Sequence, residues 1–299
     1  MTRICLIGEG MVELSGGPAR GWAVGHGGDT LNTGIHLARM GHDVAYATAL
    51  GDDAFSAGLR DSWAAEGLDL TPTLTAAGRM PGLYAIQTDD AGERSFAYWR
   101  GESAARSMFD LPDSDRLIAQ AGAADLLVYS LITLAILSAE GRGRLFSLCD
   151  AVRARGGRVA FDGNYRPRLW PDAATARAAR DAAIARCDIG LPTLADEVEM
   201  GEADDAAATA ARWSALGCAE PVVKLGVEGC LVAGQTVPPP ARVTVVDSSG
   251  AGDAFNAGYL SARIGGAVPV EAALAGHRLA GWAIGHAGAI PARKDDAPY

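Results

Sequence analysis

Short apolar runs alternate with longer helical segments along most of this 299-residue chain, and this alternation limits the possible folds more than any other feature. The apolar runs contain few polar positions, which is typical of strands buried on both faces of a parallel sheet. They span residues 3–8, 44–50, 126–130, 158–162, 188–191, 222–225 and 230–233. The helical segments span 30–40, 54–66, 139–155, 173–186, 204–216, 251–264 and 270–286. The pattern predicts an α/β fold with helices on both faces of a mostly parallel sheet.

Two segments, about 11–25 and 82–100, carry no helical pattern and interrupt this alternation. The second predicts a hairpin with strands at 83–88 and 94–99 and a turn at 89–93. Its residues 95–100 alternate between apolar and polar, so one face is expected to be covered and the other solvated. We expect a small β lid over a binding site. Because no repeat or linker divides the sequence, we expect residues 1–299 to form one domain that carries this lid.

The balance of charged residues excludes several classes of protein. A formal charge of −10, without any basic run, argues against binding to nucleic acid or to an anionic membrane. No apolar run approaches the length of a membrane span or of a signal peptide. The five cysteines are scattered without a paired spacing, which indicates reduced thiols. We therefore expect a cytoplasmic protein.

A loop of small residues at 247–252 is the strongest candidate site. It follows a β-type run that ends at Val246 and leads into the helix expected from Ala251. The free N–H groups of a helix start, approached closely through glycines, form a cradle for an anion. Asp253 lies in the first turn, where it could simply interact with the helix dipole or could accept a proton from a hydroxyl during phosphoryl transfer. We expect the dipole to keep Asp253 ionised, as a weak base.

The motif DSSGAGD at 247–253 resembles the C-terminal signature of the ribokinase-like, PfkB-type sugar kinases. The motif GGDTLNT at 27–33 resembles their N-terminal glycine signature. Within that family, the segments 81–84, 92–94, 98–100 and 161–170 are similar to the 2-keto-3-deoxygluconate kinases, and the resemblance extends from about residue 5 to 291. It implies a three-layer αβα fold with a small β lid. It also implies ATP-dependent phosphorylation of 2-keto-3-deoxygluconate on its 6-hydroxyl group, giving 2-keto-3-deoxy-6-phosphogluconate.

The same resemblance implies the residues of the site. Asp253 is the implied catalytic base, within a cradle made by Gly250, Ala251 and Gly252. The implied sugar contacts are Gly28, Asp29, Asn32, Tyr84, Tyr98, Arg100, Arg166 and Asp253. The implied ATP contacts are Asn164, Tyr165, Arg166, Lys224, Gly226, Gly229, Gly250, Ala251 and Gly252.

Each of these residues also has a simpler interpretation. Guanidinium groups bind carboxylates, and phenols bind hydroxyl or keto oxygens, as an acid sugar requires. Asp29 could instead cap the helix that follows it, however, and a lone arginine or tyrosine on a strand is usually a surface or packing residue.

Magnesium is implied together with ATP, because nucleotide phosphates bring it to such sites. Many relatives hold it through water with an Asn-x-x-Glu segment. Thr193 replaces the asparagine here, so Asp196 or Glu197 would supply the carboxylate. The resemblance also allows a monovalent cation, and the exposed edges of the lid allow a homo-oligomer.

Alternatives to this function remain open. One is the same chemistry on another sugar, such as 2-ketogluconate or fructose. Another is a catalytically silent sugar sensor, which the presence of both Asp253 and the small-residue loop disfavours. An NAD-dependent dehydrogenase is weaker still, because Glu13 stands where a GxGxxG loop needs its third glycine.

Overall fold

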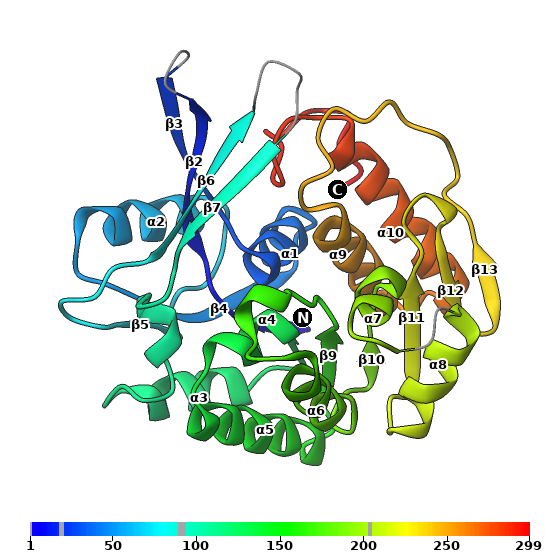
Figure 1. Cartoon of the computed structure of the whole chain (residues 1–299), viewed down its shortest axis with the longest axis horizontal. Helices are drawn as coiled ribbons and strands as arrows, with labels where there is room; N and C mark the ends of the chain where they lie inside the picture. The colour runs from blue at the N-terminus through cyan, green and yellow to red at the C-terminus, as the bar shows by residue number, and fades with distance from the viewer. Residues whose placement is uncertain (1, 18–20, 89–93, 203–204) are drawn as a thin grey trace.

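The computed structural model describes residues 2–17, 21–88, 94–202 and 205–299, and a nine-stranded sheet lies at its centre (Figure 1). The strand order is β13-β12-β11-β10-β9-β8-β1-β4-β5, with parallel pairing from β11 through β5 and antiparallel pairing in β11-β12-β13. The strands are β1 (Arg3–Ile7), β4 (Asp43–Leu50), β5 (Thr73–Thr75), β8 (Leu126–Ser130), β9 (Arg158–Asp162), β10 (Ile189–Gly190), β11 (Glu220–Lys224), β12 (Cys230–Val232) and β13 (Gln235–Val237). The predicted α/β fold with a mostly parallel sheet is confirmed.

Helices cover both faces of this sheet. Alternate residues of β1 belong to different cores: Cys5 and Ile7 pack with the cluster that includes α3, α5 and α6, whereas Ile4 and Leu6 pack with the cluster that includes α1, α9 and α10. This is the three-layer arrangement implied by the family resemblance. The helices are α1 (Asp29–Arg39), α2 (Ala54–Ala65), α3 (Ser114–Gly122), α4 (Leu131–Ile136), α5 (Ala139–Ala154), α6 (Ala173–Ile184), α7 (Leu194–Glu199), α8 (Ala206–Ala215), α9 (Ala251–Ile264) and α10 (Pro269–Ile284).

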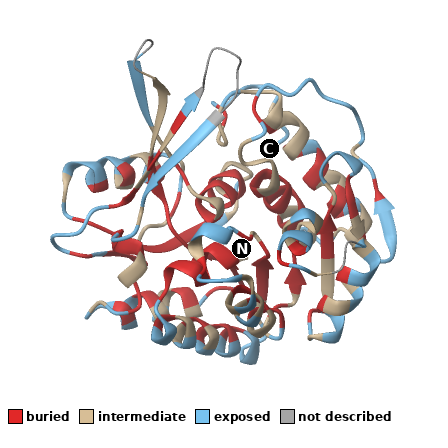
Figure 2. Cartoon of the chain, in the orientation of Figure 1, coloured by how far each residue is buried: buried red, intermediate tan, exposed pale blue. Residues whose placement is uncertain are grey.

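A separate four-stranded sheet forms the lid, in the order β3-β2-β6-β7. Its strands are β2 (Met11–Gly17), β3 (Gly21–Gly27), β6 (Gly82–Thr88) and β7 (Arg94–Trp99). It projects from the main sheet, and its outer strands β3 and β7 are largely exposed (Figures 1 and 2). The predicted hairpin is confirmed as β6 and β7, and β2 adds to it in parallel. The predicted turn at 89–93 lies outside the described residues.

The β-type run that ends at Val246 was expected to be a strand, and this expectation is corrected because no strand forms there. Val245 and Val246 are more than half exposed, and the N–H groups of Val246 and Asp247 donate to the carbonyl of Ile284 at the end of α10, at 2.8 and 3.1 Å. The β-branched residues gave a strand signal, but no strand of the described sheet pairs with them.

No helix in the described part of the chain is long and apolar enough to span a membrane.

Candidate active site

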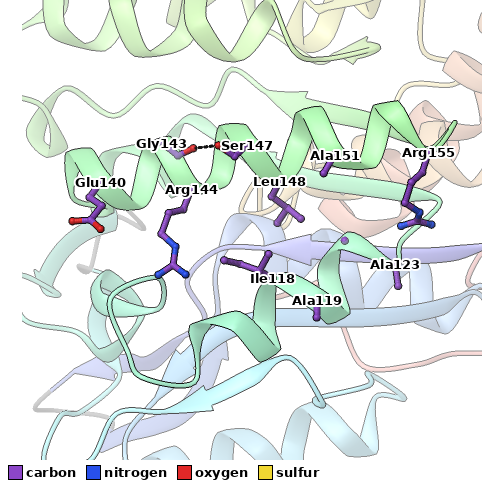
Figure 3. Close-up of a pocket in the computed structure, with 11 residues that line it drawn as sticks. Ile118, Ala119, Ala123, Glu140, Gly143, Arg144, Ser147, Leu148, Ala151 and Arg155 are labelled. Carbon is purple, nitrogen blue, oxygen red and sulfur yellow. Dashed lines mark hydrogen bonds between the residues drawn. The ribbon is translucent and has the colours of Figure 1, made fainter.

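A cleft of about 1570 Å³ lies between the lid and the main sheet, and it gathers most of the residues singled out in the sequence. Those that line it are Gly28, Asp29, Asn32, Tyr84, Tyr98, Arg100, Asn164, Arg166, Asp196, Lys224, Gly226, Gly250, Ala251, Gly252 and Asp253. Tyr165, Glu197 and Gly229 are not among the lining residues. A second hollow of about 840 Å³ lies between α3 and α5, and none of the predicted site residues lines it (Figure 3).

The N-terminus of α9 forms the expected cradle at one end of the cleft. Gly250 precedes the helix with φ of 69°, and a Cβ atom there would lie 2.7 Å from the Cβ of Ala289, so only glycine fits without strain. No side chain caps this helix, and no described residue accepts a hydrogen bond from the N–H of Gly252 or Asp253. These donors and the helix dipole together favour a bound anion.

Asp247 shapes the loop that leads into this cradle, a role the sequence analysis did not assign. Its Oδ1 accepts from the N–H of Ser249 and its Oδ2 from the N–H of Gly288, both at 2.8 Å. The carboxylate therefore ties the loop to the segment after α10. An Asp two residues before a loop N–H is a common turn signal, which is the clue the sequence offered.

Asp253 is buried at the floor of the cleft, where its Oδ2 accepts a 2.7 Å hydrogen bond from the Nδ2 of Asn32. Burial, followed by the charge of Asp29, raises the pKa of Asp253 to about 8, although the Asn32 hydrogen bond opposes the shift. The expectation that the helix dipole keeps this group ionised is therefore corrected, because desolvation and neighbouring acids outweigh the dipole. A carboxyl group whose pKa lies near neutrality is suited to accept a proton from a hydroxyl group.

Asp29 lies at the start of α1 and faces the same space. Its Oδ1 accepts from the N–H of Thr30 at 2.8 Å, and its Oδ2 accepts from the Nδ2 of Asn164 at 3.2 Å. The N-cap position belongs to Gly28, so Asp29 is not the capping residue. A Cβ atom on Gly28 would lie 2.2 Å from the carbonyl oxygen of Glu9, which requires glycine at this close approach.

Lys224 belongs to a closed buried network beside the cradle. Its Nζ donates to Asp162 Oδ1 at 2.9 Å and to Asn256 Oδ1 at 3.2 Å, and Asn256 Nδ2 donates to Asp162 Oδ2 at 2.8 Å. A Cβ atom on Gly252 would lie 3.7 Å from the Nζ, so the ammonium group lies next to the anion cradle. The sequence analysis missed Asp162 and Asn256 as partners, although Asn256 follows Asp253 by one helical turn.

The lid presents two tyrosines to the cleft. Glu13, Tyr84 and Tyr98 occupy one row across β2, β6 and β7, so their side chains share a face. The rings of Tyr84 and Tyr98 stack with centroids 6.0 Å apart, and the Tyr84 hydroxyl donates to Glu13. Tyr98 remains 48% exposed, so its ring is free to contact a ligand.

Arg100 directly follows the lid strand β7 and pairs with Glu9, which follows β1 of the main sheet. Both side chains are buried, with exposed fractions of 10% and 0%. The ion pair therefore joins the lid to the body of the molecule and compensates the charge of Arg100. Sequence reasoning had no signal for this pair, because its members are 91 residues apart.

Asp196 and Glu197, the two candidates for the magnesium carboxylate, point to different places. Asp196 lines the cleft, accepts from the N–H of Tyr165 at 3.2 Å and lies 3.8 Å from the Nη1 of Arg166. Glu197 is buried away from the cleft and accepts from Arg180 at 2.6 Å and from the indole of Trp213 at 3.1 Å. No cluster of three or more metal-ligating side chains occurs among residues 2–17, 21–88, 94–202 and 205–299.

Of the other residues predicted to contact the nucleotide, some line the cleft and others do not. Asn164, Arg166 and Gly226 line the cleft. Tyr165 is buried and belongs to the core cluster that also contains residues of α5 and α6. A Cβ atom on Gly229 would lie 2.1 Å from the carbonyl oxygen of Val237, so this glycine allows the tight turn between β11 and β12 to pack against β13.

Comparison with known proteins gives consistent results. The model of the family described as "pfkB family carbohydrate kinase" matches residues 1–296. The chain is similar to the 2-dehydro-3-deoxygluconokinase of Dickeya dadantii, with 41% identity over 96% of each chain, and to the Escherichia coli protein of that name, with 41% identity over 98% of each. Among solved structures it is similar to a PfkB protein from a Polaromonas species, with a TM-score of 0.83, 28% identity and 97% of each chain covered.

Proposed function

Because the chain belongs to the pfkB family of carbohydrate kinases, we propose that it transfers the γ-phosphoryl group of ATP to the 6-hydroxyl of 2-keto-3-deoxygluconate, also called 2-dehydro-3-deoxygluconate. The observation that carries the proposal is the set of residues that line one cleft. Asp253 and the start of α9, which no side chain caps, line it together with Tyr84, Tyr98, Arg100 and Arg166. The 41% identity to relatives named for this activity supports the choice of sugar.

In the proposed reaction, a carboxylate oxygen of Asp253 accepts the proton of the 6-hydroxyl group as the hydroxyl oxygen bonds to the γ-phosphorus of ATP. The bond from that phosphorus to the bridging oxygen breaks, and ADP leaves with the electron pair. The N–H groups of Gly252 and Asp253 and the ammonium of Lys224 are placed to stabilise the charge on the transferred group. Asp253 then releases its proton to solvent.

The residues at the nucleotide end fit ATP and magnesium. We propose that Asn164, Arg166, Lys224, Gly226 and the 250–252 cradle contact the nucleotide, and that Asp196 holds Mg²⁺ through water, because it alone of the two candidate carboxylates lines the cleft. Magnesium, when bound, offsets the negative charge of the phosphates. A requirement for a monovalent cation stays a prediction of the family resemblance.

Assembly and location follow as further parts of this proposal. Trp22, Val24 and Trp99 are 45%, 66% and 61% exposed on the lid face opposite Tyr84, and we expect a second copy of the chain to cover them. Sedimentation of the wild type and of Trp99→Glu tests this contact.

We propose a cytoplasmic location for the protein, because it is proposed to use ATP and its five cysteines are free.

A coupled assay of ADP release with Mg-ATP tests the proposed function. The sugars compared are 2-keto-3-deoxygluconate, 2-ketogluconate, gluconate and fructose, and phosphorus NMR locates the new phosphate. We expect selective turnover of 2-keto-3-deoxygluconate and a 6-phosphate product. Turnover of fructose alone would reject the acid sugar and keep the kinase. Failure with every sugar, together with tight sugar binding, would favour a silent sensor.

A further inference from the structure

Five basic side chains line the cleft, and the described structure pairs three of them with acids. Arg100 is paired with Glu9, Lys224 with Asp162, and Arg166 lies 3.8 Å from Asp196. The other two, Arg106 and Arg168, form no hydrogen bond or ion pair with any residue that the structure describes. An anionic substrate that enters a cleft with so many acids needs a positive charge that is not already balanced.

Arg106 differs from Arg168 in its surroundings. Arg168 is exposed to solvent, whereas Arg106 is only partly exposed, on the short helix η1 (Ala104–Ser107). Charges that are partly removed from water interact more strongly and are screened less by salt. Arg106 is therefore the unpaired cation of the cleft with the stronger expected effect on a bound anion.

Arg106 lies at the end of the cleft that we assign to the sugar. Its helix η1 follows the lid strand β7 within five residues, and Arg100 and Gly101 between them also line the cleft. The predicted sugar contacts Tyr84 and Tyr98 line the same cleft and belong to the lid sheet that leads into η1, and Ile132 of α4 lines the cleft from the main body. Lys224 and Gly226, which we assign to the nucleotide, come instead from β11 and the turn after it.

The neighbourhood of Arg106 adds positive charge. Arg142 is stacked on the ring of Trp170, with its guanidinium 4.8 Å from the ring centroid, and donates to the carbonyl of Leu134. Burial and then the charge of Arg106 lower the pKa of Arg142, which places the two guanidinium groups within electrostatic reach of each other. Neither has an acidic partner among the described residues.

We propose that Arg106 is a specificity-determining residue that binds the carboxylate of the acid sugar. The proposal rests on the proposed function and adds a residue to its substrate site. Arg100 also lines the cleft, but Glu9 already balances its charge and the pair holds the end of the lid against the body. A neutral sugar gains nothing from Arg106, so this residue separates acid sugars from neutral ones.

The test compares Arg106→Gln and Arg106→Lys with Arg278→Gln as a matched control, since Arg278 is an exposed arginine of α10 outside the cleft. The measurements are KM and kcat for 2-keto-3-deoxygluconate at low and high salt, and the inhibition constant of fructose. Loss of a charge-assisted hydrogen bond predicts that KM rises about tenfold to a hundredfold in Arg106→Gln. We expect kcat and the fructose constant to change less than threefold, Arg106→Lys to recover most of the loss, and the loss to shrink at high salt.

A KM of Arg106→Gln within twofold of the wild type would overturn the inference, as would equal losses for the acid and the neutral sugar. Failure of the lysine variant to recover any affinity would also overturn it. Turnover by the wild type in the same experiment separates the two proposals. If the wild type phosphorylates 2-keto-3-deoxygluconate and Arg106→Gln is unchanged, only this inference fails. If the wild type does not, the proposed function fails and this inference fails with it.

Discussion

The floor of the cleft and the lid above it hold their polar side chains in different ways. On the floor, Asp253 is buried and bonded to Asn32, and Lys224 is enclosed by Asp162 and Asn256. On the lid, Tyr84 and Arg100 are paired with Glu13 and Glu9, but Tyr98 is nearly half exposed and its ring stacks on Tyr84. The floor is therefore ordered before any ligand arrives, whereas the exposed ring of Tyr98 is expected to gain contacts when one is bound.

This difference implies a division of work between the two regions. Groups that must act on a proton or on a transferred phosphoryl group benefit from fixed positions, because they then need no reorganisation during the reaction. Groups that recognise a sugar act through affinity. Changes on the floor should alter kcat or the stability of the fold, and changes on the lid should alter KM.

The largest expected effect comes from removing the base on the floor. Asp253→Asn keeps the shape of the side chain and its neighbour Asn32 but cannot accept the proton. We expect kcat to fall about 10²- to 10⁴-fold, the usual contribution of a general base. The coupled ADP-release assay measures it, with circular dichroism to check the fold. A kcat within fivefold of the wild type would contradict the role of Asp253.

The next effect concerns stability and the Lys224 network. Lys224→Met leaves Asp162 buried without its cation, which should lower the free energy of unfolding by about 3–5 kcal/mol. The double variant with Asp162→Asn should recover part of this loss, because no unpaired charge remains. Denaturation in urea measures both. If the double variant is as unstable as Lys224→Met, the network is not the cause.

A smaller effect on the floor depends on pH. Because burial and Asp29 raise the pKa of Asp253 to about 8, the folded protein keeps a proton that the unfolded chain releases above about pH 4. The free energy of unfolding should therefore fall with rising pH by up to about 1.4 kcal/mol per pH unit through this window, and Asp253→Asn should lack this contribution. Urea denaturation of both proteins from pH 5 to 8 measures the difference in slope. Parallel slopes would show that Asp253 has an ordinary pKa.

The smallest effect is expected on the lid. Tyr98→Ala removes an exposed ring that contacts Tyr84 and Phe96, so stability should change by less than about 1 kcal/mol. KM for the sugar should rise about tenfold, as expected for one lost neutral hydrogen bond and its ring contact, while kcat changes little. Tyr98→Phe serves as the control that keeps the ring. A fall in kcat with unchanged KM would contradict the division between floor and lid.

Features set by neighbouring residues could be predicted from the sequence, and features set by distant partners could not. The small-residue loop and the helix from Ala251 are local signals, and the structure confirms that helix. The run that ends at Val246 also carries a local strand signal, but no strand that the structure describes pairs with it, so the prediction was wrong. Similarly, Asp253 was expected to be ionised from its helix alone, whereas its pKa depends on Asp29 and on burial.

The two carboxylates of α7 show the same limit. Asp196 and Glu197 are adjacent in the sequence, and successive helical residues point about 100° apart, so only one of them can face the cleft. Which one does so is decided by Arg180 and Trp213, which bind Glu197 from α6 and α8. The position of Arg106 at the cleft likewise depends on how η1 packs after the lid, which no local pattern indicates.

Calorimetric titration of 2-keto-3-deoxygluconate into the wild type, Asp253→Asn and Tyr98→Ala tests the division between floor and lid most directly. We predict that Asp253→Asn binds the sugar within about threefold of the wild type although it has lost turnover, and that Tyr98→Ala binds about tenfold more weakly although its kcat is retained. Weakened binding in Asp253→Asn with unchanged binding in Tyr98→Ala would contradict the account.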